Sequence, residues 1–330
     1  MDPVLNIDRL TLEFPIYGGA VRALDAVSIT VRPGEIVGVV GESGCGKSVT
    51  AMTTLRLIPD DRYRVIGGSI TLLGVDMLSA GEKALATIRG ARASMIFQEP
   101  LTALNPTRRV GDQMVEVIRA HQRISAAAAT ARATRLLSEM RIADAAEVLR
   151  RYPFELSGGM RQRVVIALAF ANDPAIVIAD EPTTALDVTV QRQVLLLLRQ
   201  RSRDVGAAVL LITHDMGVVS EYTERVYVMY AGRVVESGPT AAVLGDPAHP
   251  YTRALLAGLP GSVAPKAVLQ SIPGRVPDLR RVPDGCAFAP RCGQAMACCR
   301  QAPPLVAIPS PDGPVPRFAA CWLPAAEAAS

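Results

Sequence analysis

GESGCGKS, residues 41–48, is the most informative stretch of this sequence. It matches the pattern G-x-x-x-x-G-K-[ST] at every fixed position. The apolar, β-branched run Ile36–Val40 precedes it, and the residues after it contain no proline or glycine before Pro59. Strand, loop and helix in this order are the context that a phosphate-binding loop, or P-loop, requires.

The residue types in this loop suit phosphate binding for separate reasons. Its glycines let consecutive backbone N–H groups face phosphate oxygens without an intervening Cβ, and the following helix adds the positive end of its dipole. Lys47 can bridge the β- and γ-phosphates of a nucleotide, and the Ser48 hydroxyl can ligate Mg²⁺. We therefore predict that the chain binds MgATP here, with Cys45 as a bystander thiol at a free position of the pattern.

The composition of the 330-residue chain is that of a globular protein, with 49% hydrophobic and 20% charged residues. Its length accommodates one large α/β domain and an appendage. A net charge of +4 without a cluster of basic residues does not indicate a nucleic-acid partner. No apolar run approaches the roughly 18–20 residues that cross a bilayer, and the first residues do not resemble a signal peptide, so we expect a cytosolic chain.

Polar side chains follow three predicted apolar strands. Gln98 follows the first, Asp180 and Glu181 follow the second, and His214 follows the third. Because parallel strands present their carboxyl ends at one edge of a sheet, we expect these side chains near a ligand. Asp180 suits the Mg²⁺ shell, and Glu181 can orient and deprotonate water beside the γ-phosphate. Taken singly, Gln98 and His214 are also explained as ordinary structural residues.

The remaining segments predict an antiparallel region, a helical block and a tail. Residues 4–30 alternate short apolar runs with turn residues, and residues 110–151 repeat apolar positions at helical spacing. The block ends at Leu156–Arg163, LSGGMRQR, where a serine and two glycines open either a second anion site or a plain capped helix. Prolines and glycines become frequent from Pro239 onward, so we place a boundary near Gly238.

In their order and spacing these motifs resemble the ATP-binding subunits of ABC transporters, over residues 4 to about 238. Within that family, Phe97–Pro106, Ala179–Asp187 and His249–Thr252 are similar to the oligopeptide/dipeptide importers, and the P-loop resembles that of their D-type subunit. The resemblance implies an α/β P-loop NTPase core of the ABC type, with an antiparallel β subdomain and a helical insertion at about 99–165. We expect the nucleotide-binding domain over residues 1–238 and a loop-rich, cysteine-containing extension over residues 239–330.

The resemblance also implies roles for single residues. Two ATPase subunits would close head to tail around two ATP molecules, and Asp187, in the D-loop, would reach across their interface. Tyr17 would stack on adenine, Gln98 would sense the γ-phosphate, and His214 would hold the γ-phosphate and the attacking water. The implied nucleotide contacts are Tyr17, Gly41, Ser43, Gly44, Cys45, Gly46, Lys47, Ser48 and Val49; the Mg²⁺ shell is Ser48, Gln98 and Asp180; the catalytic residues are Glu181, His214 and Gln98; and the signature that contacts the partner's ATP is Ser157, Gly158, Gly159 and Gln162.

Five of the six cysteines lie in the tail, where a reducing compartment favours a metal or iron–sulfur site over disulfides. The segment resembles the cysteine-rich end of peptide-importer ATPases, some of which carry a [4Fe–4S] cluster. Four thiolates can enclose such a cluster, and their spacing is wider than that of usual structural zinc sites, although Zn²⁺ remains the alternative. The predicted ligands are Cys286, Cys292, Cys299 and Cys321, with Cys298 as a spare thiol.

The implied partners are a second, F-type ATPase subunit, two transmembrane permease subunits and an extracytoplasmic solute-binding protein, with this chain peripheral at the cytoplasmic face of the membrane and no nucleic-acid partner. Peptides are the expected cargo, and nickel or another solute is the alternative, because proteins outside this chain select the cargo. An ABC-type ATPase of DNA repair is the competing class, but such proteins usually carry long coiled-coil or zinc-bearing insertions where this sequence has one compact helical block. A module without hydrolysis is disfavoured by the presence of Glu181 and His214.

Overall fold

The structure is a computed structural model that describes residues 2–98, 103–184, 186–258, 272–309 and 316–327. The chain forms two compact units. Unit 1 comprises Met1–Val4, Val31–Glu35 and Leu73–Ile212, and unit 2 comprises Leu5–Thr30, Ile36–Leu72 and Thr213–Ser330. Residues 99–102, at the predicted start of the helical insertion, and Ala185, before the predicted D-loop aspartate, lie outside the described residues.

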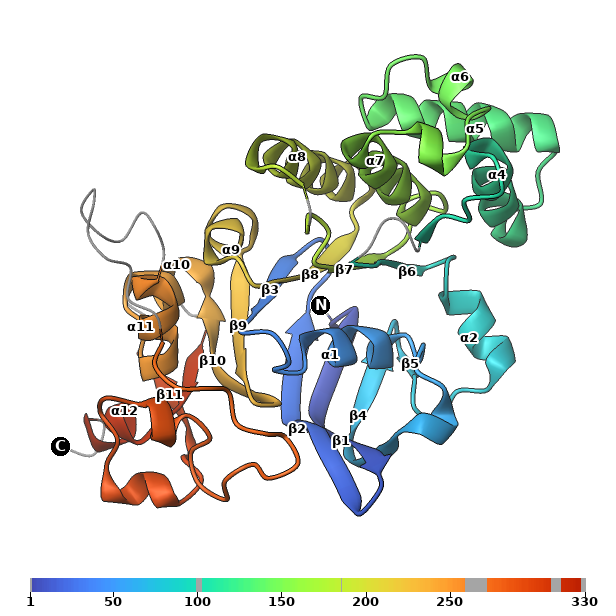
Figure 1. The fold of residues 1–330 in the computed structure, drawn as a ribbon. Coiled ribbons are helices and arrows are strands. Elements are labelled where there is room, and N and C mark those ends of the chain that lie inside the picture. The colour runs from blue at the N-terminus through green and yellow to red at the C-terminus, as the bar shows by residue number, and fades with distance from the viewer. Residues whose placement is uncertain (1, 99–102, 185, 259–271, 310–315, 328–330) are drawn as a thin grey trace. The chain divides into compact units, whose positions relative to one another are not determined.

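Unit 1 has three parallel strands in the order β8-β7-β6 and a group of helices (Figure 1). Every residue of β7 is buried, which explains its unbroken apolar sequence, since strands covered on both faces do not alternate. Ser125 caps α5 (Ala126–Glu139), accepting a hydrogen bond from the Ala128 N–H at 3.2 Å. The elements are β5 (Val75–Asp76), α2 (Glu82–Ile88), β6 (Ala93–Ile96), α4 (Val110–His121), α5 (Ala126–Glu139), α6 (Ala145–Val148), η2 (Pro153–Glu155), α7 (Gly158–Ala169), β7 (Ile176–Asp180), α8 (Val188–Val205) and β8 (Ala208–Thr213).

Unit 2 contains the predicted antiparallel strands and the strand that leads into the P-loop. β1 pairs antiparallel with β4, whereas β3 runs parallel to β9. Antiparallel pairing then continues from β9 through β10 and β12 to β11. The strands are β1 (Leu5–Ile16), β2 (Gly19–Val31), β3 (Ile36–Val40), β4 (Arg64–Leu72), β9 (Arg225–Tyr230), β10 (Arg233–Pro239), β11 (Leu305–Ile308) and β12 (Arg317–Ala320). The helices are α1 (Lys47–Thr54), η1 (Asp60–Arg62), α9 (Met216–Tyr222), α10 (Thr240–Gly245), α11 (Pro250–Ala257), η4 (Ala289–Arg291), η5 (Ala297–Arg300) and α12 (Trp322–Glu327).

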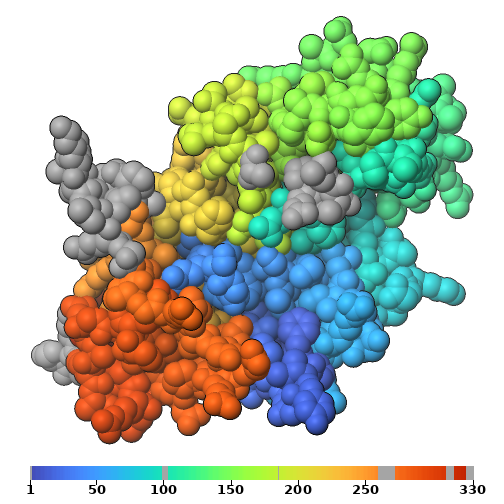
Figure 2. All heavy atoms as spheres, in the orientation of Figure 1, coloured from blue at the N-terminus to red at the C-terminus, as the bar shows by residue number. Residues whose placement is uncertain are grey.

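The C-terminal extension is more regular than the density of prolines and glycines indicates. Its described residues form three α-helices, two 3₁₀ helices and two strands, and β12 pairs with β10 at Glu236 and Ser237, next to the proposed boundary. Figure 2 shows this orange and red segment beside the blue N-terminal part of the same unit, where the Leu279 carbonyl accepts a hydrogen bond from the Arg22 N–H at 3.3 Å. The extension is therefore built into unit 2.

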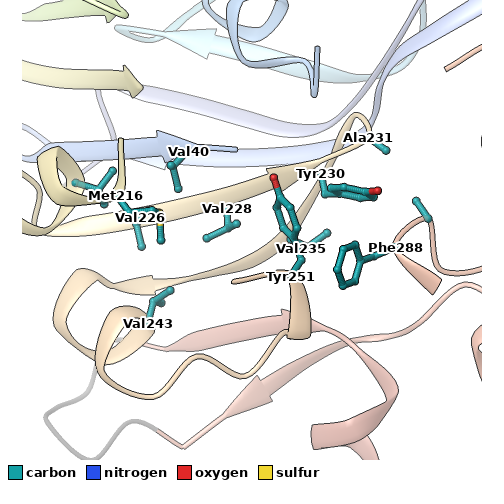
Figure 3. Packing of buried hydrophobic residues seen from close by; sticks show 12 residues of the cluster. Val40, Met216, Val226, Val228, Tyr230, Ala231, Val235, Val243, Tyr251 and Phe288 are labelled. Carbon is teal, nitrogen blue, oxygen red and sulfur yellow. The ribbon is translucent and has the colours of Figure 1, made fainter. Parts of the chain in front are cut away.

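Three aromatic rings join the extension to the strand that pairs with the P-loop strand (Figure 3). The ring centroid of Tyr230, in β9, lies 4.6 Å from that of Tyr251 in α11 and 5.3 Å from that of Phe288. Tyr230 and Tyr251 are fully buried, and Phe288 is almost so. Aromatic pairs add about 0.5–1.5 kcal/mol each beyond the area they bury. This cluster holds the extension close to the P-loop strand.

A buried ionic network adjoins the aromatic cluster, where the ring centroids of His249 and Phe288 are 6.0 Å apart. Glu236 and Arg317 form an ion pair of 3.1 Å, and the Glu236 carboxylate also accepts hydrogen bonds from the N–H groups of Ala248 and His249 at 2.9 Å. His249 Nδ1 accepts a hydrogen bond from the Tyr251 N–H at 3.0 Å, and burial lowers the pKa of His249 to about 4. The neutral imidazole is thus the form that caps α11 and fixes Tyr251.

None of the helices in the described parts of the chain combines the length and hydropathy that a membrane crossing requires.

Candidate functional site

The P-loop requires glycine at two of its positions. A Cβ on Gly41 would lie 2.2 Å from the Met229 carbonyl oxygen and 2.8 Å from Cys45 Sγ. Gly46 has φ +104°, and a Cβ there would lie 2.8 Å from the Ala23 carbonyl oxygen. Close approach to neighbouring backbone therefore fixes both residues. Ser43 and Gly44 lie in the loop between β3 and α1, and Ser48 and Val49 lie in the first turn of α1.

The Lys47 side chain lies against the backbone of its own loop. The residue is 5% exposed, and its Nζ donates hydrogen bonds to the carbonyl oxygens of Gly41 at 2.7 Å and Glu42 at 3.1 Å. An ammonium held at this place by two neutral acceptors is ready to exchange them for phosphate oxygens, to which it binds more strongly. Cys45 is fully buried, and desolvation raises the pKa of its thiol, so it stays neutral and unreactive.

Tyr17 and His214 are also in unit 2, and both side chains are exposed. Tyr17 lies at the turn between β1 and β2, and His214 follows β8 directly. The next residue, Asp215, caps α9 by accepting hydrogen bonds from the N–H groups of Gly217 and Val218. The cap fixes the backbone beside His214, but the contact of either exposed side chain with a nucleotide stays a prediction.

In unit 1 the structure brings Gln98 and Glu181 together. The Glu181 carboxylate accepts hydrogen bonds from Gln98 Nε2 at 3.1 Å and from Thr184 Oγ1 at 2.9 Å. Glu181 has φ +46°, a conformation that costs a residue with a side chain free energy and is found mostly where the surrounding structure imposes it. Asp180, which precedes it, is 4% exposed at the end of β7. Thr184 was not among the predicted site residues, although it lies only three positions after the glutamate.

The signature residues open α7, and its serine acts as the helix cap. Ser157 Oγ accepts a hydrogen bond from the Met160 N–H at 3.4 Å, and both Ser157 and Gly158 are exposed. A Cβ on Gly159 would lie 2.9 Å from Val190 Cγ1 in α8, so this glycine permits the two helices to approach. Asp187 caps α8, accepting a hydrogen bond from the Val190 N–H at 2.9 Å. The signature and the D-loop aspartate therefore lie at the ends of two helices in contact.

Gln162, one turn into α7, is 1% exposed, and neither atom of its amide has a hydrogen-bond partner within the part of the chain that the structure describes. A buried amide without partners is costly, about 1–3 kcal/mol. Its burial separates it from the exposed Ser157 and Gly158, so Gln162 does not share their surface.

In unit 2, the four predicted metal ligands line one small cavity of about 10 Å³. Two of the sulfurs accept backbone N–H hydrogen bonds at 3.4 Å, Cys292 from Gln294 and Cys299 from Met296. Such hydrogen bonds stabilise thiolate ligands. Cys298 is exposed and is not part of the cavity lining.

The cysteines are nevertheless not arranged around a common metal position. Among the described residues, no group of three or more histidine, cysteine, aspartate or glutamate side chains is placed to hold a metal ion. Burial raises the pKa of the Cys286, Cys292 and Cys321 thiols. The four thiols therefore line one cavity, but the structure does not show the predicted iron–sulfur or zinc centre.

Two family models match separate parts of the chain. The family model described as "ABC transporter" matches residues 24–184, and the model described as "Oligopeptide/dipeptide transporter, C-terminal region" matches residues 235–299. The chain is 58% identical over 328 residues to the probable D,D-dipeptide transport ATP-binding protein DdpD of Escherichia coli, covering 99% of each chain. It is 44% identical over 324 residues to the oligopeptide transport ATP-binding protein OppD of Salmonella typhimurium, covering 98% of this chain and 95% of that one.

A solved structure supports the fold. The ATP-binding cassette MJ0796, in a dimeric post-hydrolysis state with ADP and Pi, matches with a TM-score of 0.64 and 26% identity, covering 72% of this chain and 98% of that one. The predicted fold class, an α/β cassette with antiparallel strands and a helical block, is confirmed. The chain belongs to the ABC transporter family of ATPases, in the group that carries the oligopeptide/dipeptide transporter C-terminal region.

Proposed function

We propose that this chain binds and hydrolyses ATP to power the import of peptides through a separate membrane permease. The observation that carries the proposal is the presence of both family regions in one chain, together with 58% identity to a probable D,D-dipeptide transport ATP-binding protein over nearly its whole length. The name of this relative points to dipeptides as the cargo class of this chain. Nickel or another solute is the second candidate, because the cargo is selected outside this chain.

The proposal assigns each site residue a separate task. Lys47 and Ser48 would hold MgATP on the P-loop, and Asp180 would complete the Mg²⁺ shell with Ser48 and Gln98. Glu181, held by the side chains of Gln98 and Thr184, would orient and deprotonate the attacking water, and His214 would hold the γ-phosphate. Under this proposal, the chain supplies a residue for each step of hydrolysis.

The proposed assembly contains a second ATPase subunit of the F type, two permease subunits and a solute-binding protein. Ser157 and Gly158 are exposed at the start of α7, as a surface that meets the ATP of another subunit must be. Through the permease the chain would lie peripherally at the cytoplasmic face of the membrane.

The test of this function is reconstitution of the chain with its permease, second ATPase and binding protein in vesicles. We expect ATP hydrolysis to rise several-fold when the binding protein carries a dipeptide, with uptake of labelled dipeptide. A Lys47→Ala complex is the control, because it assembles without a competent P-loop. Stimulation by nickel instead of peptides would support the second candidate. Stimulation of the isolated chain by DNA, with no response to the permease, would reject both in favour of a DNA-repair ATPase.

We also propose that Cys286, Cys292, Cys299 and Cys321 hold a [4Fe–4S] cluster, with Zn²⁺ as the alternative. The support is the chemistry of the donor set: four cysteines line one cavity, and the sulfurs of Cys292 and Cys299 accept backbone N–H hydrogen bonds. The cavity of about 10 Å³ has roughly the volume that one water occupies. Binding of a cluster therefore requires the cysteine loops to move outward. Its role would be to brace the extension.

This assignment predicts that protein purified without oxygen contains about four iron and four sulfide per chain. Cys292→Ser should lose them, whereas Cys298→Ser, at an exposed thiol outside the cavity, should keep them. Metal and acid-labile sulfide analysis of both variants and the parent protein gives the answer. Stoichiometric zinc without sulfide would replace the cluster by the alternative, and free thiols without metal would reject both.

A further inference from the structure

One residue of the extension is directed at the P-loop. Arg291, at the end of η4, makes a two-pronged ion pair with Glu42: Nη1 lies 2.7 Å from Oε2, and Nη2 lies 3.1 Å from Oε1. Glu42 is the second residue of the P-loop. The Arg291 side chain is 5% exposed and that of Glu42 is 28% exposed. Shielded, bidentate pairs of this kind are stronger than exposed ion pairs, which contribute about 0–1 kcal/mol.

The rest of the Arg291 guanidinium is also fixed. Its Nε donates a hydrogen bond to the Pro273 carbonyl oxygen at 2.8 Å, and Nη2 donates one to the Ile272 carbonyl oxygen at 3.3 Å. Nη1 also donates to the Tyr230 hydroxyl at 3.3 Å. Because every guanidinium nitrogen has a partner, the orientation of the fork toward Glu42 is determined by the extension and β9.

A second residue of the extension holds the backbone of the same glutamate. The Tyr251 hydroxyl accepts a hydrogen bond from the Glu42 N–H at 2.9 Å, and the Tyr251 ring is fixed in the aromatic cluster with Tyr230 and Phe288 (Figure 3). The Glu42 carbonyl oxygen, in turn, accepts a hydrogen bond from Lys47 Nζ at 3.1 Å. The side chain, N–H and C=O of Glu42 are therefore all held, the first two by the extension and the third by the phosphate-binding lysine.

We propose that Arg291 and Tyr251 are positioning residues for the P-loop, which hold Glu42 so that the loop and Lys47 are already arranged for the phosphates before ATP arrives. A loop that is ordered in advance loses less conformational entropy when ligand binds. The C-terminal extension thus sets the affinity of the ATP site from within unit 2. This inference rests on the proposed binding of MgATP to the P-loop.

The experiment measures MgATP binding by equilibrium titration of the purified full-length chain with a fluorescent ATP analogue. We expect Arg291→Ala to raise Kd about tenfold. Tyr251→Phe, which removes only the hydroxyl that accepts the Glu42 N–H hydrogen bond, should raise Kd about threefold. In the complex, both should raise KM for ATP and leave kcat within about twofold, because they alter binding in the ground state. The matched control is Arg280→Ala: this arginine is in the same segment, but it pairs with Asp278 and is 64% exposed, so its Kd should not change.

A double-mutant cycle tests whether Arg291 acts through Glu42. Glu42→Ala should also weaken binding, and Arg291→Ala with Glu42→Ala should be no weaker than the worse single variant. Arg291→Lys keeps the positive charge but loses the bidentate geometry, so its Kd should lie between those of Arg291→Ala and the parent protein. It replaces Arg291→Ala in the measurement if the alanine variant does not fold. A Kd within twofold of the parent in folded Arg291→Lys and Tyr251→Phe, or fully additive effects, would overturn the inference. Failure of the parent chain itself to bind MgATP would instead reject the proposed function.

Discussion

Glu181→Gln should reduce ATP hydrolysis by the assembled complex about 10²- to 10³-fold while MgATP still binds. The carboxylate is the proposed base for the attacking water, and general base catalysis contributes about 10²–10⁴ to rates. Glutamine has nearly the same size, and its amide oxygen can still accept the hydrogen bonds that Gln98 and Thr184 donate to Glu181. The substitution therefore removes the proton acceptor and preserves the local structure.

The strained backbone of Glu181 gives this experiment its specificity. With φ +46°, Glu181 has a backbone conformation that costs a residue with a side chain free energy. Glutamine has nearly the same size as glutamate and meets the same backbone cost at this φ, so the substitution adds no strain. We therefore expect Glu181→Gln to melt at the temperature of the parent protein, so that its loss of turnover is not a loss of fold.

Two further variants complete the measurement. Lys47→Ala should weaken MgATP binding itself, because the ammonium is proposed to bind the β- and γ-phosphates. Glu147→Gln is the control. The Glu147 carboxylate is exposed, and its ion pair with Arg150 is long, at 3.9 Å, and therefore weak. Steady-state ATPase rates, measured together with equilibrium nucleotide binding, distinguish loss of turnover in Glu181→Gln from loss of binding in Lys47→Ala and from no change in Glu147→Gln. Turnover by Glu181→Gln at the parent rate would reject the catalytic assignment.

Local rules explain why the P-loop and strand ends could be predicted from the sequence. Gly46 needs a positive φ, and Gly41 needs to meet backbone without a Cβ, so both requirements are met by residue types visible in one short stretch. The five buried residues of β7 form one apolar run for a similar reason. In each case the requirement shows in the residue types of one short stretch, although the carbonyl groups that Gly41 and Gly46 approach, those of Met229 and Ala23, are distant in the sequence.

The C-terminal extension could not be predicted in the same way. β11 and β12 have four residues each, and β12 finds its partner, β10, about eighty positions earlier in the chain, so neither has a strong local signal. The Arg291–Glu42 pair joins residues 249 positions apart. Long-range pairing of this kind is a property of the folded chain, and no periodicity in the sequence indicates it.

The second large effect on ATP hydrolysis is expected from a substitution in the signature. Ser157→Arg should lower ATP hydrolysis by a complex of two ATPase subunits about 10²-fold, the cost of removing one donor group from a charged transition state. The proposed reason is that Ser157 and the exposed start of α7 contact the ATP bound to the partner subunit. An arginine side chain at this position would occupy the space of the partner's phosphates.

Ser157 also caps α7, so the substitution needs a control that separates capping from contact. Ser157→Asn keeps a good N-cap, and Ser157→Ala removes the cap without adding bulk, at a cost of about 1 kcal/mol. If the interpretation is right, MgATP binding to this chain's own P-loop is unchanged in all three variants, while turnover falls most with arginine. The decisive measurement mixes Ser157→Arg with a partner that carries an intact P-loop and follows the ATP bound to that partner. Full turnover in this mixture, or activity of the purified single chain that does not depend on its concentration, would contradict a site shared between two subunits.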